Sequence, residues 1–184
     1  MLSFSKHNKY SNIATIKELN LISNWINPND SLEYILLYRA SSDGDDAKTF
    51  HKLCDLKNPT LTLISTTDGW KFGGYTDVYW TSFRDLDDWE YRTSQKTFIF
   101  SLNKQIKYPS KNKGAPIFSS GRRGPSFGNG LDFSVFDHSL TSKSTCNSPI
   151  SFSNMKEKNE FNGGKDYFYA TEVEVYLVLT KRKK

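Results

Sequence analysis

The sequence predicts an α+β domain in which two antiparallel β-sheets pack face to face as a sandwich with two flanking helices. Three observations predict this fold. Both segments in which apolar residues recur every three or four positions lie before Asn58. From Pro59 onward, short runs with a period of two replace them, as expected for half-buried strands. The connections between these runs are too short for crossover helices, so neighbouring strands should pair antiparallel.

The first helix is expected to begin at Thr15, because residues 15–18 (TIKE) have the form of a capping box. In this motif the Thr15 hydroxyl accepts from the Glu18 N–H, and the Glu18 carboxylate reaches back to the helix start. Pro28 and Asn29 end the helix. Its apolar stripe, which we expect to pack on the domain body, comprises Ile16, Leu19, Ile22, Trp25 and Ile26.

The second helix should follow a buried strand at 34–39 (YILLYR) and a turn at 41–45. Asp45 and Asp46 favour its N-terminal end, where the helix dipole attracts negative charge. Its apolar face comprises Ala47, Phe50, Leu53 and Cys54. We expect the two helices to cover edges or faces of the sheets.

The strands begin with a hairpin at 60–66 and 70–75, whose Asp68-Gly69 pair indicates a type I′ turn. Gly73 and Gly74 inside the second strand predict a β-bulge or a close backbone approach. Further strands are expected at 77–82, 97–102, 105–108, 116–119, 131–137 and 170–179.

Two segments between these strands are expected to be irregular. The glycine-rich stretch 121–130 predicts a wide turn that needs positive φ at its glycines. Residues 140–162, rich in Ser, Asn, Lys and Thr, predict a long surface loop and the most mobile part of the chain. We divide the chain into a lead-in at 1–33, a domain at 34–180 and a basic tail at 181–184.

The composition excludes several classes of protein. The 184 residues, 36% hydrophobic and 15% aromatic, can bury the core of one domain. No apolar run reaches the roughly 18 residues of a membrane helix and no secretory signal is apparent, so we expect a soluble cytoplasmic protein without a transmembrane segment. Four of the five net positive charges come from 181–184, which argues against a nucleic-acid partner.

The two cysteines give little support for catalysis. Cys54 and Cys146 are too few for a disulfide framework and fit no zinc spacing. His51 lies three residues before Cys54 on the second helix, which raises the possibility of a Cys/His nucleophile pair. Cys54 falls on the apolar stripe, however, and no third group is identifiable to orient a base, so packing is the favoured interpretation.

Acidic and glycine-rich segments are the candidates for ligand sites. The run Asp85, Asp87, Asp88 and Glu90 could collect calcium, but it matches no EF-hand spacing, so a solvated loop is favoured. Helix capping is favoured for Asp43, Asp45 and Asp46. Segment 121–130 could cradle a phosphate beside Arg122 and Arg123 but contains neither a P-loop nor a dinucleotide fingerprint. We predict no catalytic residue, metal or cofactor; His7 and His138 form no ligand cluster in sequence.

Five segments resemble, in order, the TLDc domain family: 36–55, 58–80, 97–102, 124–133 and 170–178. The matching motif residues, expected to be mainly structural, are Arg39, Asp43, Phe50, His51, Cys54, Asp55, Phe72, Gly73, Gly74, Tyr75, Gly124, Pro125, Phe127, Gly128, Gly130, Asp132, Glu172 and Glu174. In the family's usual GPTFGGGHD turn, Asn129 and Leu131 here replace a glycine and the histidine. This departure weakens any role that depends on the turn histidine.

The resemblance implies a two-sheet β-sandwich with flanking helices, a role in oxidative-stress protection and binding to the cytosolic sector of the vacuolar proton-pumping ATPase. No established active site accompanies the family. We therefore expect a non-catalytic protein-interaction module of the cytoplasm. The alternatives are a permanent structural subunit of a large assembly and, less favoured, a thiol-based redox or hydrolytic enzyme.

Overall fold

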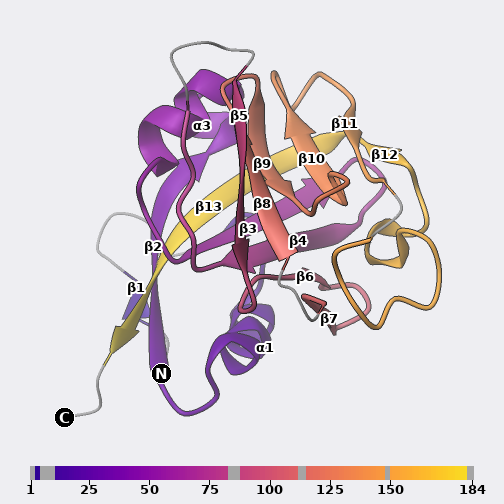
Figure 1. Cartoon of the computed structure of the whole chain (residues 1–184). Helices are drawn as coiled ribbons and strands as arrows, with labels where there is room; N and C mark the ends of the chain where they lie inside the picture. Colours follow the sequence, from indigo (N-terminus) through magenta and orange to yellow (C-terminus); the bar gives the residue numbers. More distant parts are fainter. Residues whose placement is uncertain (1–2, 5–10, 83–87, 112–114, 148–149, 182–184) are drawn as a thin grey trace.

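The computed structural model describes residues 3–4, 11–82, 88–111, 115–147 and 150–181 (Figure 1). Two sheets face each other, with strand orders β1-β2-β13-β3-β4-β6-β7 and β12-β11-β10-β9-β8-β5. Apart from the parallel pair β1–β2, the strands pair antiparallel. The predicted α+β sandwich is therefore confirmed.

The seven-stranded sheet is built around the last strand of the chain. β13 lies between β2 and β3, so the C-terminal strand completes the sheet centre. The strands are β1 (Ser3–Phe4), β2 (Ser31–Arg39), β3 (Thr60–Thr66), β4 (Lys71–Thr76), β6 (Phe98–Ser101), β7 (Ile106–Pro109) and β13 (Ala170–Lys181). β2 begins three residues earlier than the predicted 34–39, and β13 runs on into the predicted basic tail because Lys181 pairs with Ser31.

The six-stranded sheet contains four strands that the sequence interpretation missed: β5, β9 and the two-residue strands β11 and β12. Its strands are β5 (Trp89–Ser94), β8 (Ala115–Ser120), β9 (Arg123–Phe127), β10 (Phe133–Phe136), β11 (Ser144–Thr145) and β12 (Tyr167–Phe168). β9 replaces the wide turn predicted at 121–130: Phe127 pairs with Ile117 on one side and with Phe133 on the other. The strand predicted at 77–82 is absent, and Trp80 makes an isolated bridge to Asp55.

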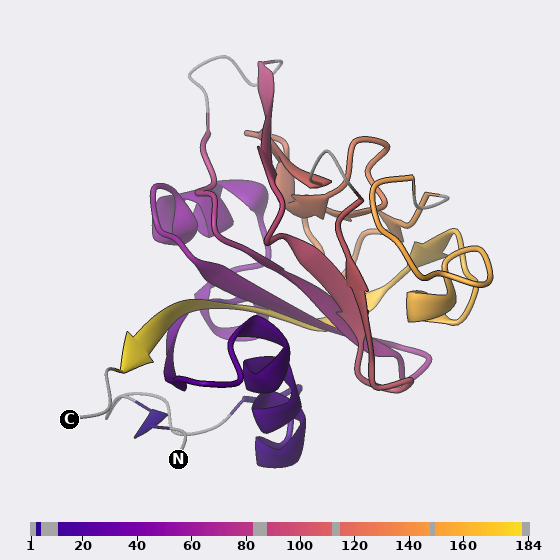
Figure 2. The same ribbon diagram turned by 60° about the horizontal axis from the view of Figure 1, so that its bottom comes forward.

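Helix α1 (Ile16–Ile26) confirms the capping-box prediction. The Glu18 N–H donates to Thr15 Oγ1 (3.3 Å), and the Thr15 N–H donates to Glu18 Oε2 (2.8 Å). Leu19 and Ile22 are buried, whereas Ile16 is 54% exposed and lies off the packing face. Figure 2 shows α1 beneath the seven-stranded sheet, on the side away from the six-stranded sheet.

The segment between β2 and β3 is more helical than predicted. The turn expected at 41–45 contains α2 (Ala40–Asp43), which ends at Gly44 (φ 113°). α3 (Ala47–Cys54) follows, and Asp46 caps it by accepting from the Thr49 N–H (2.8 Å), as the acidic start predicted. Its buried face comprises Ala47, Phe50, His51 and Cys54, while Leu53 is only partly buried.

The β3–β4 turn is a three-residue loop rather than the predicted type I′ hairpin. The Gly69 N–H donates to Thr66 O (3.0 Å), and Gly69 has φ 84°, whereas Asp68 keeps a negative φ. A type I turn followed by a left-handed glycine has this pattern. Gly69 alone supplies the positive φ that closes the loop.

Apolar side chains fill two layers. Between the sheets lie Ile64, Phe72, Trp80, Phe127 and Phe133, among others. A second cluster, between the seven-stranded sheet and α1, contains Leu19, Ile22, Tyr34, Leu61, Leu63, Tyr75 and Phe98. Because successive strand residues point to opposite faces, β3 contributes to both clusters, with Leu61 and Leu63 toward α1 and Ile64 into the sandwich.

The segment 140–162, predicted as a surface loop, is largely irregular and exposes several residues, but part of it enters the core. It holds β11 and the short 3-10 helix η1 (Glu160–Asn162), and Cys146, Phe152 and Phe161 are buried in the sandwich. The sequence did not predict these core contacts, because the apolar residues of the segment are widely spaced. Each enters the core from an irregular backbone rather than from a strand with a period of two. None of the helices in the described part of the chain is long and apolar enough to span a bilayer.

Candidate functional site

His51 is fixed by hydrogen bonds on both sides of its ring. Nδ1 lies 2.7 Å from Asp55 Oδ1, and Nε2 lies 2.9 Å from Ser120 O and 3.0 Å from Arg123 O. A carbonyl oxygen can only accept, so Nε2 carries a hydrogen and donates to these two groups. With both nitrogens engaged, neither is free to take a proton from Cys54. His51 instead fastens α3 to the β8–β9 turn.

The two thiols are buried. Cys54 and Cys146 both have 0% exposure, and burial raises the pKa of each thiol far above its ordinary value. The Cys146 sulfur accepts a hydrogen bond from Asn162 Nδ2 (3.3 Å). Thiolates are the reactive form of cysteine, so these environments suppress reactivity in the folded protein.

The motif residues Arg39 and Glu174 form a buried ion pair. Glu174 is fully buried, and Arg39 Nη2 lies 2.6 Å from its Oε1. The same carboxylate accepts from Ser11 Oγ (2.5 Å), the Asn12 N–H (2.9 Å) and Tyr176 Oη (2.9 Å). These bonds attach the lead-in of the chain to β13, so the pair holds the segment that carries α1.

Glu172 and Asp43 hold the short helix α2 in the same region. Glu172 accepts from the Ser41 N–H (3.0 Å) and from the Ser41 hydroxyl. Asp43 accepts from the Arg39 N–H (2.7 Å), which closes the turn from β2 into α2. The structure thus brings four motif residues, Arg39, Asp43, Glu172 and Glu174, into one polar cluster whose contacts join β2, α2 and β13.

The glycine-rich motif after β9 is held by a buried carboxylate. Asp132 is fully buried and accepts from the Ser151 N–H (2.9 Å) and the Ile150 N–H (3.3 Å). Burial raises the pKa of Asp132 above its usual value. Gly128 has φ 92°, and a Cβ there would lie 2.4 Å from the Asp132 Cγ. The turn therefore anchors residues 150–151.

Gly73 and Gly74 allow close packing on the two faces of β4. The register between β3 and β4 is continuous, so no bulge forms. A Cβ at Gly74 would lie 2.6 Å from the Phe127 ring of the opposite sheet, and one at Gly73 would lie 2.0 Å from Thr62 O. The remaining motif residues lie in the core or in strand ends and turns: Phe50, Phe72, Tyr75, Gly124, Pro125, Phe127 and Gly130.

The acidic candidates do not assemble in the described residues. Asp85 and Asp87 lie outside them, and Glu90 pairs with Arg92 (2.6 Å). His138 lies 3.6 Å from Asp45, and His7 is also outside the described part. Across the described ranges, no three His, Cys, Asp or Glu side chains come together as a potential metal site.

A different group of residues forms a contiguous exposed surface on the outer face of the six-stranded sheet. We call it the open face and define it by Trp89, Tyr91, Phe118, Arg123 and Phe136. Ile117 and Val135 point into the core, so their strand neighbours Phe118 and Phe136 point outward. Trp89 is 60% exposed, and the other four side chains are partly exposed.

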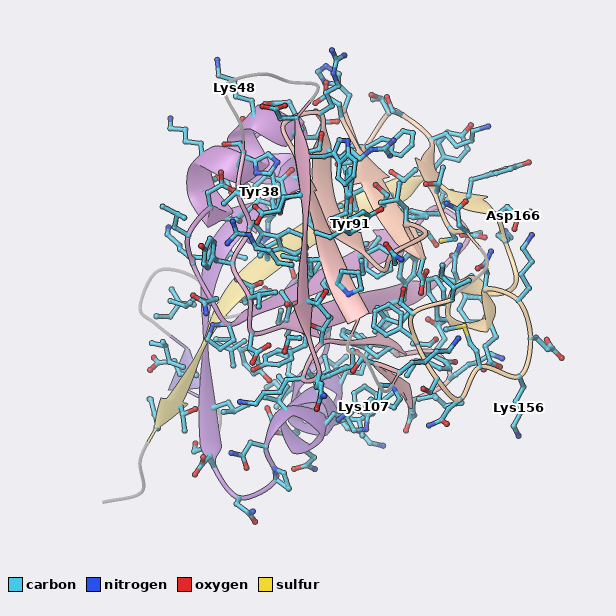
Figure 3. All side chains as sticks on the ribbon, in the orientation of Figure 1. Tyr38, Lys48, Tyr91, Lys107, Lys156 and Asp166 are labelled. Atoms are coloured by element: carbon cyan, nitrogen blue, oxygen red, sulfur yellow. The ribbon has the colours of Figure 1, made fainter. Side chains whose placement is uncertain are left out.

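Ring contacts make the open face continuous. The Tyr91 ring lies 5.5 Å from Trp89 and 5.2 Å from Phe118, and the Trp89 ring stacks on Phe118 at 6.0 Å. The Arg123 guanidinium lies 4.3 Å from the Phe136 ring and 6.0 Å from that of Phe118. In Figure 3, Tyr91 is labelled on β5, well separated from Lys107 beside α1.

A hollow of about 370 Å³ opens on this face, and Phe118, Arg123 and Phe136 line it together with Ser120, Arg122, Asp137 and Ser142. Neither His51 nor Cys54 lines this hollow. The sequence interpretation missed the site because β5 and β9 were not recognised as strands. The available signal was the alternation of Trp89, Tyr91 and Thr93, which places both aromatic rings on one face of a strand.

Comparison with known protein families gives one assignment. The family model described as the TLDc domain matches residues 7–179. The match includes α1 and all the strands except β1 and the last two residues of β13, so the helix that covers the seven-stranded sheet belongs to the matched unit. A search of curated proteins gives no match.

Proposed function

The chain belongs to the TLDc domain family, and on that premise we propose that it is a non-catalytic module that acts by docking onto protein partners. The open face carries this proposal. Exposed apolar patches on a protein surface often mark interaction sites. Trp, Tyr and Arg, three of the residue types on this face, are also those that contribute most to the binding energy of protein interfaces.

The arrangement of the reactive side chains supports a role without catalysis. Both nitrogens of His51 bind within the fold, and Cys54 is buried with a thiol that burial keeps protonated. Nucleophilic catalysis needs an accessible nucleophile and a base able to take its proton. The Cys54–His51 pair has neither, so we assign both residues to the packing of α3.

We propose the cytosolic sector of the vacuolar proton-pumping ATPase as the first partner to test, because the family resemblance implies it. The protein would then act at a cytoplasmic surface. In this proposal any contribution to oxidative-stress protection comes from docking rather than from thiol chemistry, since Cys54 and Cys146 are both buried.

Affinity purification of the full chain from its native cell, followed by quantitative mass spectrometry, tests the proposal. We expect the chain to co-purify with a larger assembly that includes the same partner in each replicate. An isotope-labelled copy added to the lysate should exchange into that assembly within minutes, as expected for a regulator. Recovery as a free monomer would contradict docking, and failure to exchange would indicate the permanent-subunit alternative.

The thiol-enzyme alternative has a separate test. A thiol reagent added to the folded chain should label Cys54 and Cys146 slowly, and the rate should rise when denaturant unfolds the protein. Mass spectrometry of the labelled peptides distinguishes the two sites. Labelling of Cys54 in the native protein as fast as that of a free thiol would support the enzyme and contradict our assignment.

A further inference from the structure

We propose that the hollow beside Arg123 binds a carboxylate of an acidic peptide segment, and that apolar side chains next to that carboxylate pack on the aromatic rings of the open face. This inference rests on the proposed function and specifies the chemistry of the partner. Arg123 is the recognition residue, and Phe118 and Phe136 form the walls that receive the apolar side chains.

The buried Arg39 and the half-buried Arg92 and Arg123 differ in how their charge is compensated. Arg39 lies 2.6 Å from Glu174, and Arg92 lies 2.6 Å from Glu90. Arg123 has no carboxylate within 4.0 Å in the described ranges. A guanidinium removed from water without a counter-charge is costly, so a carboxylate that docks beside it gains a strong interaction.

The guanidinium also has donors to spare. An arginine carries five N–H groups, and in the described structure Arg123 Nη1 donates to Ser134 Oγ (3.2 Å). Ser134 and its neighbour Ser126 are fully buried and hydrogen-bond to each other (2.7 Å). The Phe136 ring, 4.3 Å away, restricts the guanidinium on one side. A planar group held in this way favours two parallel bonds to a carboxylate.

Asp137, the one acidic residue that lines the hollow, is already engaged elsewhere. Its Oδ1 accepts from the Ala47 N–H (2.7 Å), and its Oδ2 lies 3.7 Å from His138 Nε2. It therefore orients the start of α3 instead of neutralising Arg123. The Ser120 hydroxyl accepts from the Arg122 N–H (3.4 Å), while Ser142 adds a second hydroxyl to the lining.

The charge distribution favours an acidic peptide over nucleic acid. Four of the five net positive charges lie at 181–184, so the rest of the sequence is nearly neutral, whereas a surface that follows a phosphate backbone needs an excess of clustered positive charge. The hollow of about 370 Å³ is small, with room for one or two side chains. Aromatic walls around a single half-buried guanidinium fit an acidic side chain flanked by apolar ones.

Selection of random decapeptides displayed on phage against the immobilised full chain tests this proposal. We expect enrichment of peptides that carry Asp or Glu next to Phe, Leu, Ile or Trp. The best peptide, made synthetically and labelled with fluorescein, should lose at least about tenfold in affinity for Arg123→Gln. Replacing its acidic residue by the matching amide should have a similar effect. Lys107→Gln, which alters a cation 4.6 Å from the Phe98 ring on the other sheet, is the matched control and should bind normally.

Folding of each variant is checked by its thermal midpoint. If Arg123→Gln does not fold, Trp89→Ser replaces it, because Trp89 is 60% exposed and should leave the fold intact while weakening the peptide. Three results would overturn the proposal. The selected peptides could lack acidic residues, no peptide could be selected, or the folded variants Arg123→Gln and Trp89→Ser could bind the peptide as tightly as the wild-type chain does. Tighter binding of a ten-nucleotide oligouridine that depends on Arg123 would also overturn it.

The two proposals fail in different ways. If an assembly co-purifies with the chain from the native cell but no acidic peptide is selected, the acidic-peptide inference is wrong and the docking function stands. Recovery of a free monomer would instead refute the docking function itself.

Discussion

The two sheets of the sandwich differ in what covers their outer faces. Over the seven-stranded sheet, Tyr34, Tyr75 and Phe98 are buried in a cluster with α1. Over the six-stranded sheet, Trp89 is 60% exposed, and Phe118 is only partly buried. Both faces present aromatic side chains from neighbouring strands. The two faces differ in what covers them: Figure 2 shows that α1 packs on the outer face of the seven-stranded sheet and not on the six-stranded sheet.

This difference separates stability from function. Apolar area removed from water contributes roughly 25 cal/mol per Å², so the face closed by α1 adds to the free energy of unfolding. The open face is not covered in this way, so its aromatic side chains add less to the free energy of unfolding and stay accessible to a partner. Substitutions on the closed face should therefore destabilise the protein, whereas those on the open face should impair binding and leave stability nearly unchanged.

The largest effect is expected for Glu174→Ala, which removes the anchor of the lead-in that carries α1. Arg39 would remain buried without its counter-charge, and Ser11 and Tyr176 would lose an acceptor. We expect a loss of about 3–5 kcal/mol in the free energy of unfolding, measured by urea denaturation. Lys158→Ala, which breaks an exposed ion pair with Asp166, should cost less than about 1 kcal/mol. Equal losses in the two variants would contradict this account of the anchor.

Ile22→Ala tests the closed face itself. Ile22 is fully buried under the sheet, so the substitution should create a cavity and cost about 2–5 kcal/mol in the same assay. Ile16→Ala, on the same helix but at a position 54% exposed, should change stability by no more than about 0.5 kcal/mol. A small effect at Ile22 would mean that α1 adds little to the fold.

A pH-dependent contribution is expected from Glu18, which joins α1 to β4. Burial alone would raise the pKa of Glu18, but hydrogen bonds from Lys71 and Thr15 outweigh it and hold the pKa below its ordinary 4.5. Because the folded-state pKa is lowered, the stabilisation is present above pH 4.5 and is lost as the pH falls through the folded-state value.

Glu18→Gln should consequently cost about 1 kcal/mol at pH 7, from the weakened cap and ion pair, and progressively less as the pH is lowered below 4.5. Thermal midpoints of both proteins between pH 7 and pH 3 measure this difference. A gap that stays constant over the whole range would show that the Glu18 charge is not involved.

The smallest effect on stability is expected on the open face. Trp89→Ser should change the free energy of unfolding by no more than about 0.5 kcal/mol, because the indole is 60% exposed. Chemical denaturation side by side with Ile22→Ala measures the contrast directly. A loss above about 1 kcal/mol would indicate that the open face is structural, and the comparison between the faces would fail.

The local signals in the sequence predicted the helices well. The Thr15–Glu18 capping box and the Asp46 cap act within one helical turn, so a short stretch of sequence contains all of their partners. β13 was also evident, because long alternation is unambiguous. By contrast, β9 could not be predicted, because Gly124, Pro125 and Ser126 are residue types typical of a turn. They form a strand only because β9 pairs with β8 and β10.

The candidate site could not be predicted for the same physical reason. Phe118, Arg123 and Phe136 come from three strands, and their contact depends on the register between those strands. Neither composition nor periodicity contains that register. The motif residues, by contrast, could be recognised from the sequence, because their order and spacing carry the family resemblance. In the structure Gly128 leaves room for the Asp132 side chain, which holds the turn by accepting from the Ser151 N–H.

The central claim is that the open face makes the functional contact. The most direct test is quantitative affinity purification, from the native cell, of wild-type chain, Trp89→Ser and Ile16→Ala, the last being an exposed apolar position on α1. All three should have thermal midpoints within a few degrees of one another. We predict that Trp89→Ser loses most of its co-purifying assembly while Ile16→Ala retains it. Undiminished recovery with Trp89→Ser, or loss confined to Ile16→Ala, would contradict the claim.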